Sequence, residues 1–314
     1  ARLFAAENYS VLDNASARIV VDDIGNFLRT TNDTYQVITA DEKTADEYAS
    51  NGFSYSTEYY ELLNQHLAPG GLVAQWIPTT LPPEQYHMVL KTFSDSFAHV
   101  QLWYFLPAHQ PGPLNSILIG SRESIVVSYD HIRTQFTENS EAFESLKVYG
   151  LTSAESLLPH FIADERVIRA AVSSAFINSL EHPRYEFYYP WDYAAVKKSN
   201  FVAIHTFITQ LKRSAYPDFL AGIEREVTDS KLLRTTFSAE FLYLLGFETF
   251  LNGMTTTAME QVFDYVLSVA PWNDSLRARI YALYTYTAAR QSNPFERARL
   301  LNRASALYES PVQP

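Results

Sequence analysis

The chain has 314 residues, of which 47% are hydrophobic, so it is long enough to bury one or two apolar cores. Its 35 acidic and 24 basic residues leave a formal charge of -11, which opposes non-specific binding to nucleic acid. The absence of cysteine excludes disulfides and thiolate chemistry, and the eight histidines show no metal-ligand spacing, so no metal site is expected. No apolar run approaches the roughly 18 residues that span a bilayer, and no basic-then-apolar leader opens the chain. As given, the chain is expected to be neither secreted by its own signal nor anchored by its own helix.

The first part of the chain predicts alternating strands and helices. After a short segment at 1–7 that resembles the end of a helix, the predicted order is strand Arg18–Val21, helix Ile24–Thr31, strand Tyr35–Ala40, an acidic loop Glu42–Tyr55, a helix from Ser56 to the Pro69–Gly71 turn, and strand Leu72–Ile77. The next segment predicts helix Pro82–Ala98, then strands Val100–Leu106 and Ser116–Gly120 as an antiparallel hairpin that closes the sheet edge. This order is typical of an α/β domain, which we expect to end near Asp130.

From there the pattern becomes helical. The predicted helices are Asn139–Lys147, Ser153–Phe161, Asp164–Ala175, Tyr193–Arg213, Tyr216–Val227, Ser230–Asn252, Thr256–Val269, Asp274–Arg290 and Pro294–Glu309, with an extended aromatic stretch at Asn178–Trp191. Weak repetition near the end matches the small-residue positions of tetratricopeptide-like helix pairs, although ordinary helix packing explains it as well. We therefore expect three regions: an α/β domain at 1–130, a helical extension and aromatic linker at 131–192, and a helical domain with degenerate repeats at 193–314.

Carboxylates follow two of the predicted strands. Asp22 and Asp23 come directly after Arg18–Val21, and Asp41 follows Tyr35–Ala40. In an open α/β sheet, ligands bind outside the carboxyl ends of the strands, so these acids mark the expected site. The alternative is structural, because Asp at a strand end is usually a helix cap or a turn former.

Four sequence motifs occur in an order that resembles the spermidine synthase family. They are DDIGNFL at 22–28, YQVITAD at 35–41, YSTEYYELLNQHLAPGGLVAQW at 55–76 and NSLEHPRYEF at 178–187. The closest likeness is to the soluble part of bacterial spermidine synthase-like proteins that are fused to a membrane transporter-like half. The likeness covers residues 1 to about 190, and the helices that follow add nothing to it.

The resemblance implies a methyltransferase-like Rossmann sheet that transfers an aminopropyl group from decarboxylated S-adenosylmethionine to a polyamine. It implies no permanently bound cofactor, with decarboxylated S-adenosylmethionine as co-substrate. In the family pattern Asp23 hydrogen-bonds the adenine amino group, and Asp41 orients or deprotonates the attacking amine. Asp22 and Gln75 are further candidates for binding the co-substrate. Tyr55 is expected at the substrate side of the cleft. A carboxylate suits this chemistry because an amine must lose a proton when it attacks a sulfonium-activated carbon.

The sequence also departs from the family. DDIG replaces the family's DDGR, so Ile24 stands where a ligand is expected to approach closely. Thr44 occupies the position of a second polyamine-binding Asp, for which Asp46 and Glu47 are the candidate substitutes, and Asp46 is the one expected to bind substrate. The family's glycine-rich turn and the acid after its second strand have no counterpart before Arg18. In the family's sheet, the first two strands lie in space between the strand that contains Val20 and the strand that contains Val37. These two strands have no counterpart here, so we expect an upstream segment or another chain to complete the sheet.

Three functions follow as alternatives. The first is an aminopropyltransferase-like enzyme, active once the sheet is complete; the second is a non-catalytic scaffold that binds a protein partner through the helical tail. The third is a methyltransferase that uses intact S-adenosylmethionine, which the same fold supports. The partners expected are a polyamine or other small cation and no nucleic acid. The expected location is cytoplasmic, or membrane-associated through a part that precedes Ala1.

Overall fold

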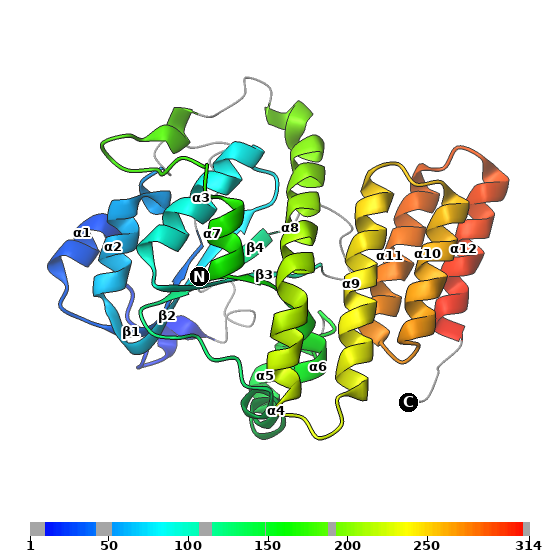
Figure 1. The fold of residues 1–314 in the computed structure, drawn as a ribbon, viewed down its shortest axis with the longest axis horizontal. Coiled ribbons are helices and arrows are strands. Elements are labelled where there is room, and N and C mark those ends of the chain that lie inside the picture. The colour runs from blue at the N-terminus through cyan, green and yellow to red at the C-terminus, as the bar shows by residue number, and fades with distance from the viewer. Residues whose placement is uncertain (1–9, 42–51, 107–114, 148, 188–192, 310–314) are drawn as a thin grey trace.

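A mixed five-stranded sheet forms the centre of the N-terminal half, and a series of helices extends from its far edge (Figure 1). The computed structural model describes residues 10–41, 52–106, 115–147, 149–187 and 193–309. The strands are β1 (Tyr35–Ala40), β2 (Leu67–Pro78), β3 (His99–Tyr104), β4 (Asn115–Ser121) and β5 (Phe161–Asp164), in the spatial order β1-β2-β4-β3-β5. β1 and β2 run parallel, whereas the pairs β2–β4, β3–β4 and β3–β5 are antiparallel. This architecture confirms the α/β, Rossmann-like fold class with a helical region after it.

The sheet is embedded in helices whose bounds largely follow the sequence pattern. Those of the N-terminal half are α1 (Ile24–Thr30), α2 (Thr57–Gln65), α3 (Pro83–Ser96), α4 (Tyr129–Glu138), α5 (Ser140–Lys147), α6 (Ala154–Leu157) and α7 (Glu165–Ala171). The later helices are α8 (Tyr193–Glu224), α9 (Lys231–Leu251), α10 (Thr256–Val269), α11 (Asp274–Arg290) and α12 (Pro294–Glu309). Figure 1 shows α9 to α12 standing side by side beyond α8, away from the sheet.

Side-chain caps explain why several helices begin where they do. Ser56 accepts a hydrogen bond from the backbone N–H of Tyr59 at the start of α2, and Asp164 accepts one from Val167 at the start of α7. Thr255 and Asn273 act in the same way for α10 and α11. Each cap satisfies a backbone donor that the first turn of a helix leaves without a partner.

The two faces of the sheet differ in how well they are covered. Along β2, Val73, Gln75 and Ile77 are fully buried on the face that packs against α2 and α3. On the opposite face, Val37 of β1 is 60% exposed and Ile117 of β4 is 41% exposed. The sheet is therefore closed by helices mainly on one side.

The predicted strand Arg18–Val21 is wrong. These residues have no regular structure, and Ile19, Val20 and Val21 are 63%, 46% and 97% exposed. β1 pairs only with β2 among the described residues, so residues 18–21 have no backbone partner in the sheet. Without such pairing, a β-branched run has nothing that holds it extended.

Two further predictions are corrected near the far edge. The predicted helix Ser153–Phe161 ends early: α6 stops at Leu157, a 3₁₀ turn covers Leu158–His160, and β5 follows. Pro159 cannot continue an α-helix, and the outer edge of β3 accepts Phe161–Asp164 as an antiparallel strand. The β3–β4 hairpin is confirmed, but β5 rather than the hairpin forms this edge of the sheet.

The long helix α8 joins two predicted helices into one. It runs from Tyr193 to Glu224 with Pro217 inside it. The helix α4 was not predicted, although Ser128 caps it. The expected helix end at 1–7 and the aromatic residues 188–191 lie outside the described residues.

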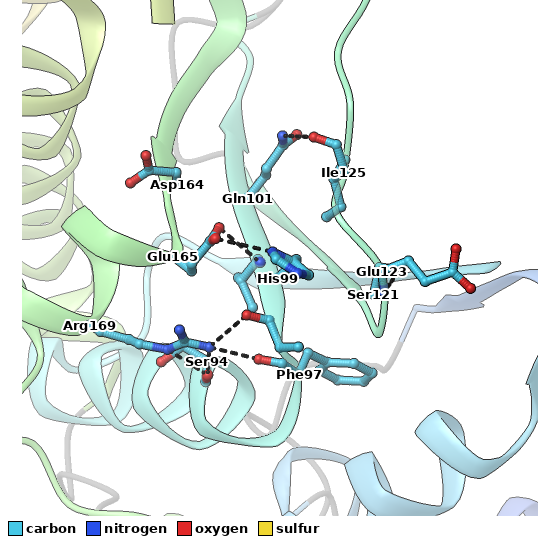
Figure 2. Close-up of polar contacts among 12 residues, drawn as sticks. Ser94, Phe97, His99, Gln101, Ser121, Glu123, Ile125, Asp164, Glu165 and Arg169 are labelled. Carbon is cyan, nitrogen blue, oxygen red and sulfur yellow. Dashed lines mark hydrogen bonds and ion pairs between the residues drawn. The ribbon is translucent and has the colours of Figure 1, made fainter. Parts of the chain in front are cut away.

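The side chain of Arg169 docks α7 against α3. Its guanidinium donates hydrogen bonds to the backbone oxygens of Ser94 at 2.8 Å and Phe97 at 2.8 Å, at the end of α3 (Figure 2). A cation at a helix C-terminus satisfies carbonyls that the last turn leaves open. This contact fixes β5 and α7 to the rest of the sheet layer.

The main apolar core is continuous from the sheet into the last helices. It includes Val73 of β2, Ile208 of α8, Phe263 of α10 and Ala304 of α12. In the described part of the chain, none of the helices is both long and apolar enough to cross a membrane.

Candidate active site at the ends of β1 and β2

The parallel pairing of β1 and β2 brings two predicted site residues together. Ala40 pairs with Gln75 in the register, so Asp41, the residue after β1, lies at the level of the end of β2. Asp41 is exposed, whereas Gln75 is 0% exposed. A solvent-accessible carboxylate and a buried carboxamide thus occur near the carboxyl ends of two neighbouring strands, where α/β sheets bind ligands.

The carboxamide of Gln75 is only half satisfied. Its Nε2 donates to the backbone oxygens of Ala40 at 3.3 Å and of Trp76 at 3.1 Å, which fixes the orientation of the amide. Its Oε1 is buried, and no donor reaches it in the part of the chain that the structure describes. A buried acceptor without a partner is destabilising by about 1–3 kcal/mol, so its presence points to a donor from a ligand or water.

Asp22 and Asp23 lie at the start of α1. Asp23 is the N-cap of the helix and accepts a hydrogen bond from the N–H of Asn26 at 3.0 Å. Asp22 accepts one from the N–H of Asp23 at 2.8 Å. Both acids therefore make the cap and turn contacts that the structural alternative predicts. Both side chains nevertheless remain exposed.

Contacts between α1 and α2 place Asp23 at the same end of the sheet as Asp41. A Cβ built on Gly25 would lie 3.0 Å from the ring of Phe53, just before α2. At the other end, His66 contacts the backbone oxygen of Leu28 at 2.7 Å. The two helices therefore run side by side with their N-termini together. This packing favours the glycine of the DDIG motif, since a Cβ there would require the Phe53 ring to shift.

Tyr55 is fully buried in the short turn Phe53–Tyr55 before α2. Its ring stacks on that of Tyr185, with 4.8 Å between the centroids. Asn178 holds the same turn, because its Nδ2 donates to the backbone oxygens of Gly52 at 2.8 Å and Tyr55 at 3.2 Å. Tyr55 is thus covered from solvent in this structure, and its place at the substrate side of the cleft stays a prediction. Asp46 lies outside the described residues.

The segment 178–187 is the feature that residue-by-residue reasoning missed. Its motif was visible in the sequence, yet no role had been assigned to its side chains. Besides the contacts of Asn178, the carboxylate of Glu186 accepts a hydrogen bond from the N–H of Gly52 at 2.7 Å. The backbone oxygen of Asn178 accepts one from the N–H of Thr57 at 3.0 Å. The segment therefore clamps the start of α2 onto the sheet.

A concavity lies near β5, away from these residues. Its volume is about 370 Å³, and it is lined by carboxylates and by Phe161 and Phe219. The carboxylates already have structural partners: Asp164 caps α7, and Glu165 contacts His99 at 3.2 Å (Figure 2). Asp218 pairs with Arg166, and Glu226 accepts hydrogen bonds from Ser128 and Tyr129. Among the described residues, no group of three or more His, Asp or Glu side chains is arranged to hold a metal.

These observations define a class of protein. The chain is a Rossmann-like α/β domain with a polar site at the carboxyl ends of a parallel strand pair, followed by a helical region. Residues 2–128, about two fifths of the chain, match the family model of the spermine/spermidine synthase domain, so this part of the chain is similar to that family. No curated protein matches the chain. The family match ends before α4, so the tetratricopeptide-like interpretation of the last helices and the three-region division stay predictions.

Proposed function

We propose that the chain supports transfer of an aminopropyl group from decarboxylated S-adenosylmethionine to a small amine of the polyamine class. The observation that carries the proposal is the register of β1 and β2. It pairs Ala40, the residue before Asp41, with the half-satisfied Gln75, inside a segment that matches this family. An amine supplies N–H donors for the Gln75 oxygen and a positive charge for the carboxylate.

The chemistry assigns a role to each residue. The amine nitrogen attacks the carbon next to the sulfonium, a new C–N bond forms, and the C–S bond breaks with its electron pair going to sulfur. The products are a neutral thioether and a longer amine, and the proton lost by nitrogen passes to the carboxylate of Asp41 or through it to solvent. Gln75 orients the amine, Tyr55 forms the wall of the site, and Asp22 and Asp23 are proposed to contact the nucleoside, with Asp46 as a further amine contact.

The edge of β1 bears on how this site is completed. β1 pairs only with β2 among the described residues, and the side chains of Val37 and of residues 19–21 are exposed. Parallel strands are usually covered on both faces, so we propose that a strand from another segment or another chain pairs with β1 and supplies the rest of the nucleoside site.

Calorimetry tests the proposed function. We expect 5′-methylthioadenosine and 1,4-diaminobutane to bind the protein, and Asp41→Asn to lower the rate of aminopropyl transfer about 100-fold or more. Asp33→Asn is the matched control, because Asp33 precedes β1 at the opposite end of the strand and contacts Arg18 at 3.5 Å. Failure of the protein to bind either compound in its complete assembly would contradict the proposal.

Intact S-adenosylmethionine is the comparison ligand in the same titration. A methyltransferase is expected to bind intact S-adenosylmethionine more tightly than the decarboxylated form, because its site holds a partner for the ligand's carboxylate. An aminopropyltransferase is expected to show the opposite order. The ratio of the two dissociation constants therefore separates the two transferase functions.

The scaffold function has one observation in its favour. A groove of about 330 Å³ between α9 and α10 is lined mainly by apolar residues, and Tyr265 at its side is 60% exposed. If the helical tail is an interaction surface, Leu245→Asp in this groove is expected to change the sedimentation of the assembly while nucleoside binding stays intact. Unchanged sedimentation argues against the scaffold.

A further inference from the structure

Gln85 in the first turn of α3 is a second buried carboxamide with an acceptor left open. Its side chain is 0% exposed. Nε2 donates to the backbone oxygen of Tyr185 at 2.7 Å, which fixes the amide plane and its orientation. Oε1 is buried, and within the described ranges no donor reaches it.

The topology places Gln85 at the same end of the sheet as the candidate site. β2 ends at Pro78 and α3 begins at Pro83, so the first turn of α3 follows directly from the carboxyl end of the strand. Gln75 projects on the β2 face that also carries Val73 and Ile77, and this face packs against α2 and α3. The two carboxamides therefore belong to one end and one face of the same layer.

Contacts distant in sequence fix the surroundings of Gln85. The backbone of Tyr185 is held at both polar groups, since its N–H donates to Asn178 Oδ1 at 3.0 Å and its oxygen accepts from Gln85. The Tyr185 ring in turn stacks on Tyr55. Gln85 is thus built into the wall that includes a predicted substrate residue.

The energetics favour a ligand as the missing partner. Replacing a buried amide oxygen that lacks a donor by an apolar group of similar shape is close to neutral or stabilising. A glutamine here is then explained by a donor other than the described residues, supplied by a ligand or by water. Amines and ammonium groups carry donors only, and several along one chain match separate acceptors.

We propose that Gln85 is a substrate-contacting residue, whose Oε1 accepts an N–H of the amine bound at the ends of β1 and β2. This inference rests on the proposed function and deepens it. With Asp41 and Gln75, it gives the site two amide acceptors and one carboxylate, which suits a diamine or polyamine with N–H groups at more than one position.

The test uses Gln85→Met, which keeps the side-chain length and removes the acceptor. We expect the dissociation constant for 1,4-diaminobutane to rise 10-fold or more, while that for 5′-methylthioadenosine stays within 2-fold. Gln65→Met is the control, since Gln65 is exposed at the end of α2. The thermal midpoint and circular dichroism of each variant are measured alongside.

A second ligand isolates the hydrogen bond from packing. The N-trimethyl derivative of 1,4-diaminobutane keeps both charges but has no N–H at one end. The unmodified protein is expected to prefer the parent diamine, and Gln85→Met is expected to lose most of that preference. If Gln85→Met acted only by removing the hydrogen bond to Tyr185, the ratio of the dissociation constants for the two amines would stay unchanged.

The outcomes separate the two proposals. If the parent protein binds the nucleoside and the diamine but Gln85→Met keeps full diamine affinity and preference, Gln85 is structural and the inference is wrong. If the parent protein binds neither ligand, the proposed function fails first and the inference falls with it.

Discussion

Asp23 combines a structural contact with a proposed ligand contact, and substitution can separate the two. Its carboxylate caps α1 through the N–H of Asn26. Asp23→Ala is expected to lower the free energy of unfolding by about 1 kcal/mol, whereas Asp23→Asn retains an N-cap oxygen and stays near the parent value. Urea denaturation measures the stability. If Asp23→Asn keeps stability and also keeps nucleoside affinity, the carboxylate has no ligand role.

Gly71 offers a sharp stability prediction. A Cβ at this position would lie 2.8 Å from the backbone oxygen of Tyr35 and 2.9 Å from that of Ala68. Backbone atoms within a strand pair cannot yield easily, so Gly71→Ala is expected to destabilise the protein by about 1–3 kcal/mol. Gly222→Ala is the control, because Gly222 lies on an exposed part of α8 with nothing within 4 Å of its added Cβ. There we expect a gain of about 0.5–1 kcal/mol, and equal effects at both sites would contradict the argument.

At the scale of residues, the sequence marks the charged part of the site but not the amide part. Asp22, Asp23 and Asp41 stand out because carboxylates next to predicted strands are visible without a structure. Gln75 came only through the family motif. Gln85 resembles any polar residue at the start of an amphipathic helix, and its burial depends on Tyr185, which lies 100 residues further along the chain.

The segment 178–187 is the element whose contribution is most directly measurable. Asn178 is 1% exposed and bonds Gly52, Tyr55 and Tyr185 through its side chain. Asn178→Ala leaves these backbone groups without partners, and we expect a loss of about 3 kcal/mol in the free energy of unfolding. Ser179→Ala, at the half-buried neighbour, is expected to stay within about 0.5 kcal/mol. A comparable loss in both variants would mean that the clamp adds nothing specific.

At the scale of elements, the sequence predicts a helix or strand correctly when the residues of that segment alone determine its structure. The predicted bounds of α10, α11 and α12 agree with the structure because caps and apolar periodicity lie within each segment. β5 and residues 18–21 failed for the opposite reason. β5 is extended because it pairs with the edge of β3, whereas residues 18–21 pair with no described strand and are irregular. Strand formation depends on partners that a local pattern does not contain.

A buried ionic cluster joins the sheet region to the helical region. Lys212 of α8 donates to the backbone oxygens of Pro159 and of Phe161, the latter at 3.0 Å. Glu240 of α9 pairs with Arg279 of α11, whose guanidinium lies 4.7 Å from the ring centroid of Tyr243. His160 is the remaining titratable group of the cluster, and it, Lys212, Glu240 and Arg279 are each less than 10% exposed. Loss of one partner in such a cluster leaves a charge without compensation.

Burial shifts the pKa values of the groups in this cluster. It lowers the pKa of Lys212 from 10.5 to about 7, against the opposing effect of Glu240. It also lowers the pKa of His160 to about 3. Burial by itself raises the pKa of Glu240, but Arg279, His160 and Lys212 outweigh it, so that this pKa lies below its ordinary value.

Lys212, His160 and Glu240 each lower the stability of the folded chain as the pH falls. In each case the unfolded chain binds more protons than the folded chain between the two pKa values, so the free energy of unfolding rises with pH in that window. The window extends from about 7 to 10.5 for Lys212 and from about 3 to 6.5 for His160. For Glu240 it lies below 4.5, where stability is lost as the carboxylate becomes protonated.

Lys212→Met tests the part of this dependence above neutral pH. Between pH 7 and 9 the parent protein is expected to gain stability relative to the variant, with a difference that rises by up to about 1.4 kcal/mol per pH unit. Lys198→Met, at an exposed position on the same helix, is expected to follow the parent at every pH. Urea unfolding at pH 7, 8 and 9 gives the three curves. A constant difference between the parent and Lys212→Met would show that Lys212 keeps its charge on folding, held by Glu240 and the two carbonyls. In that case the junction between the sheet and the helices is a permanent ionic contact that does not respond to pH in this range.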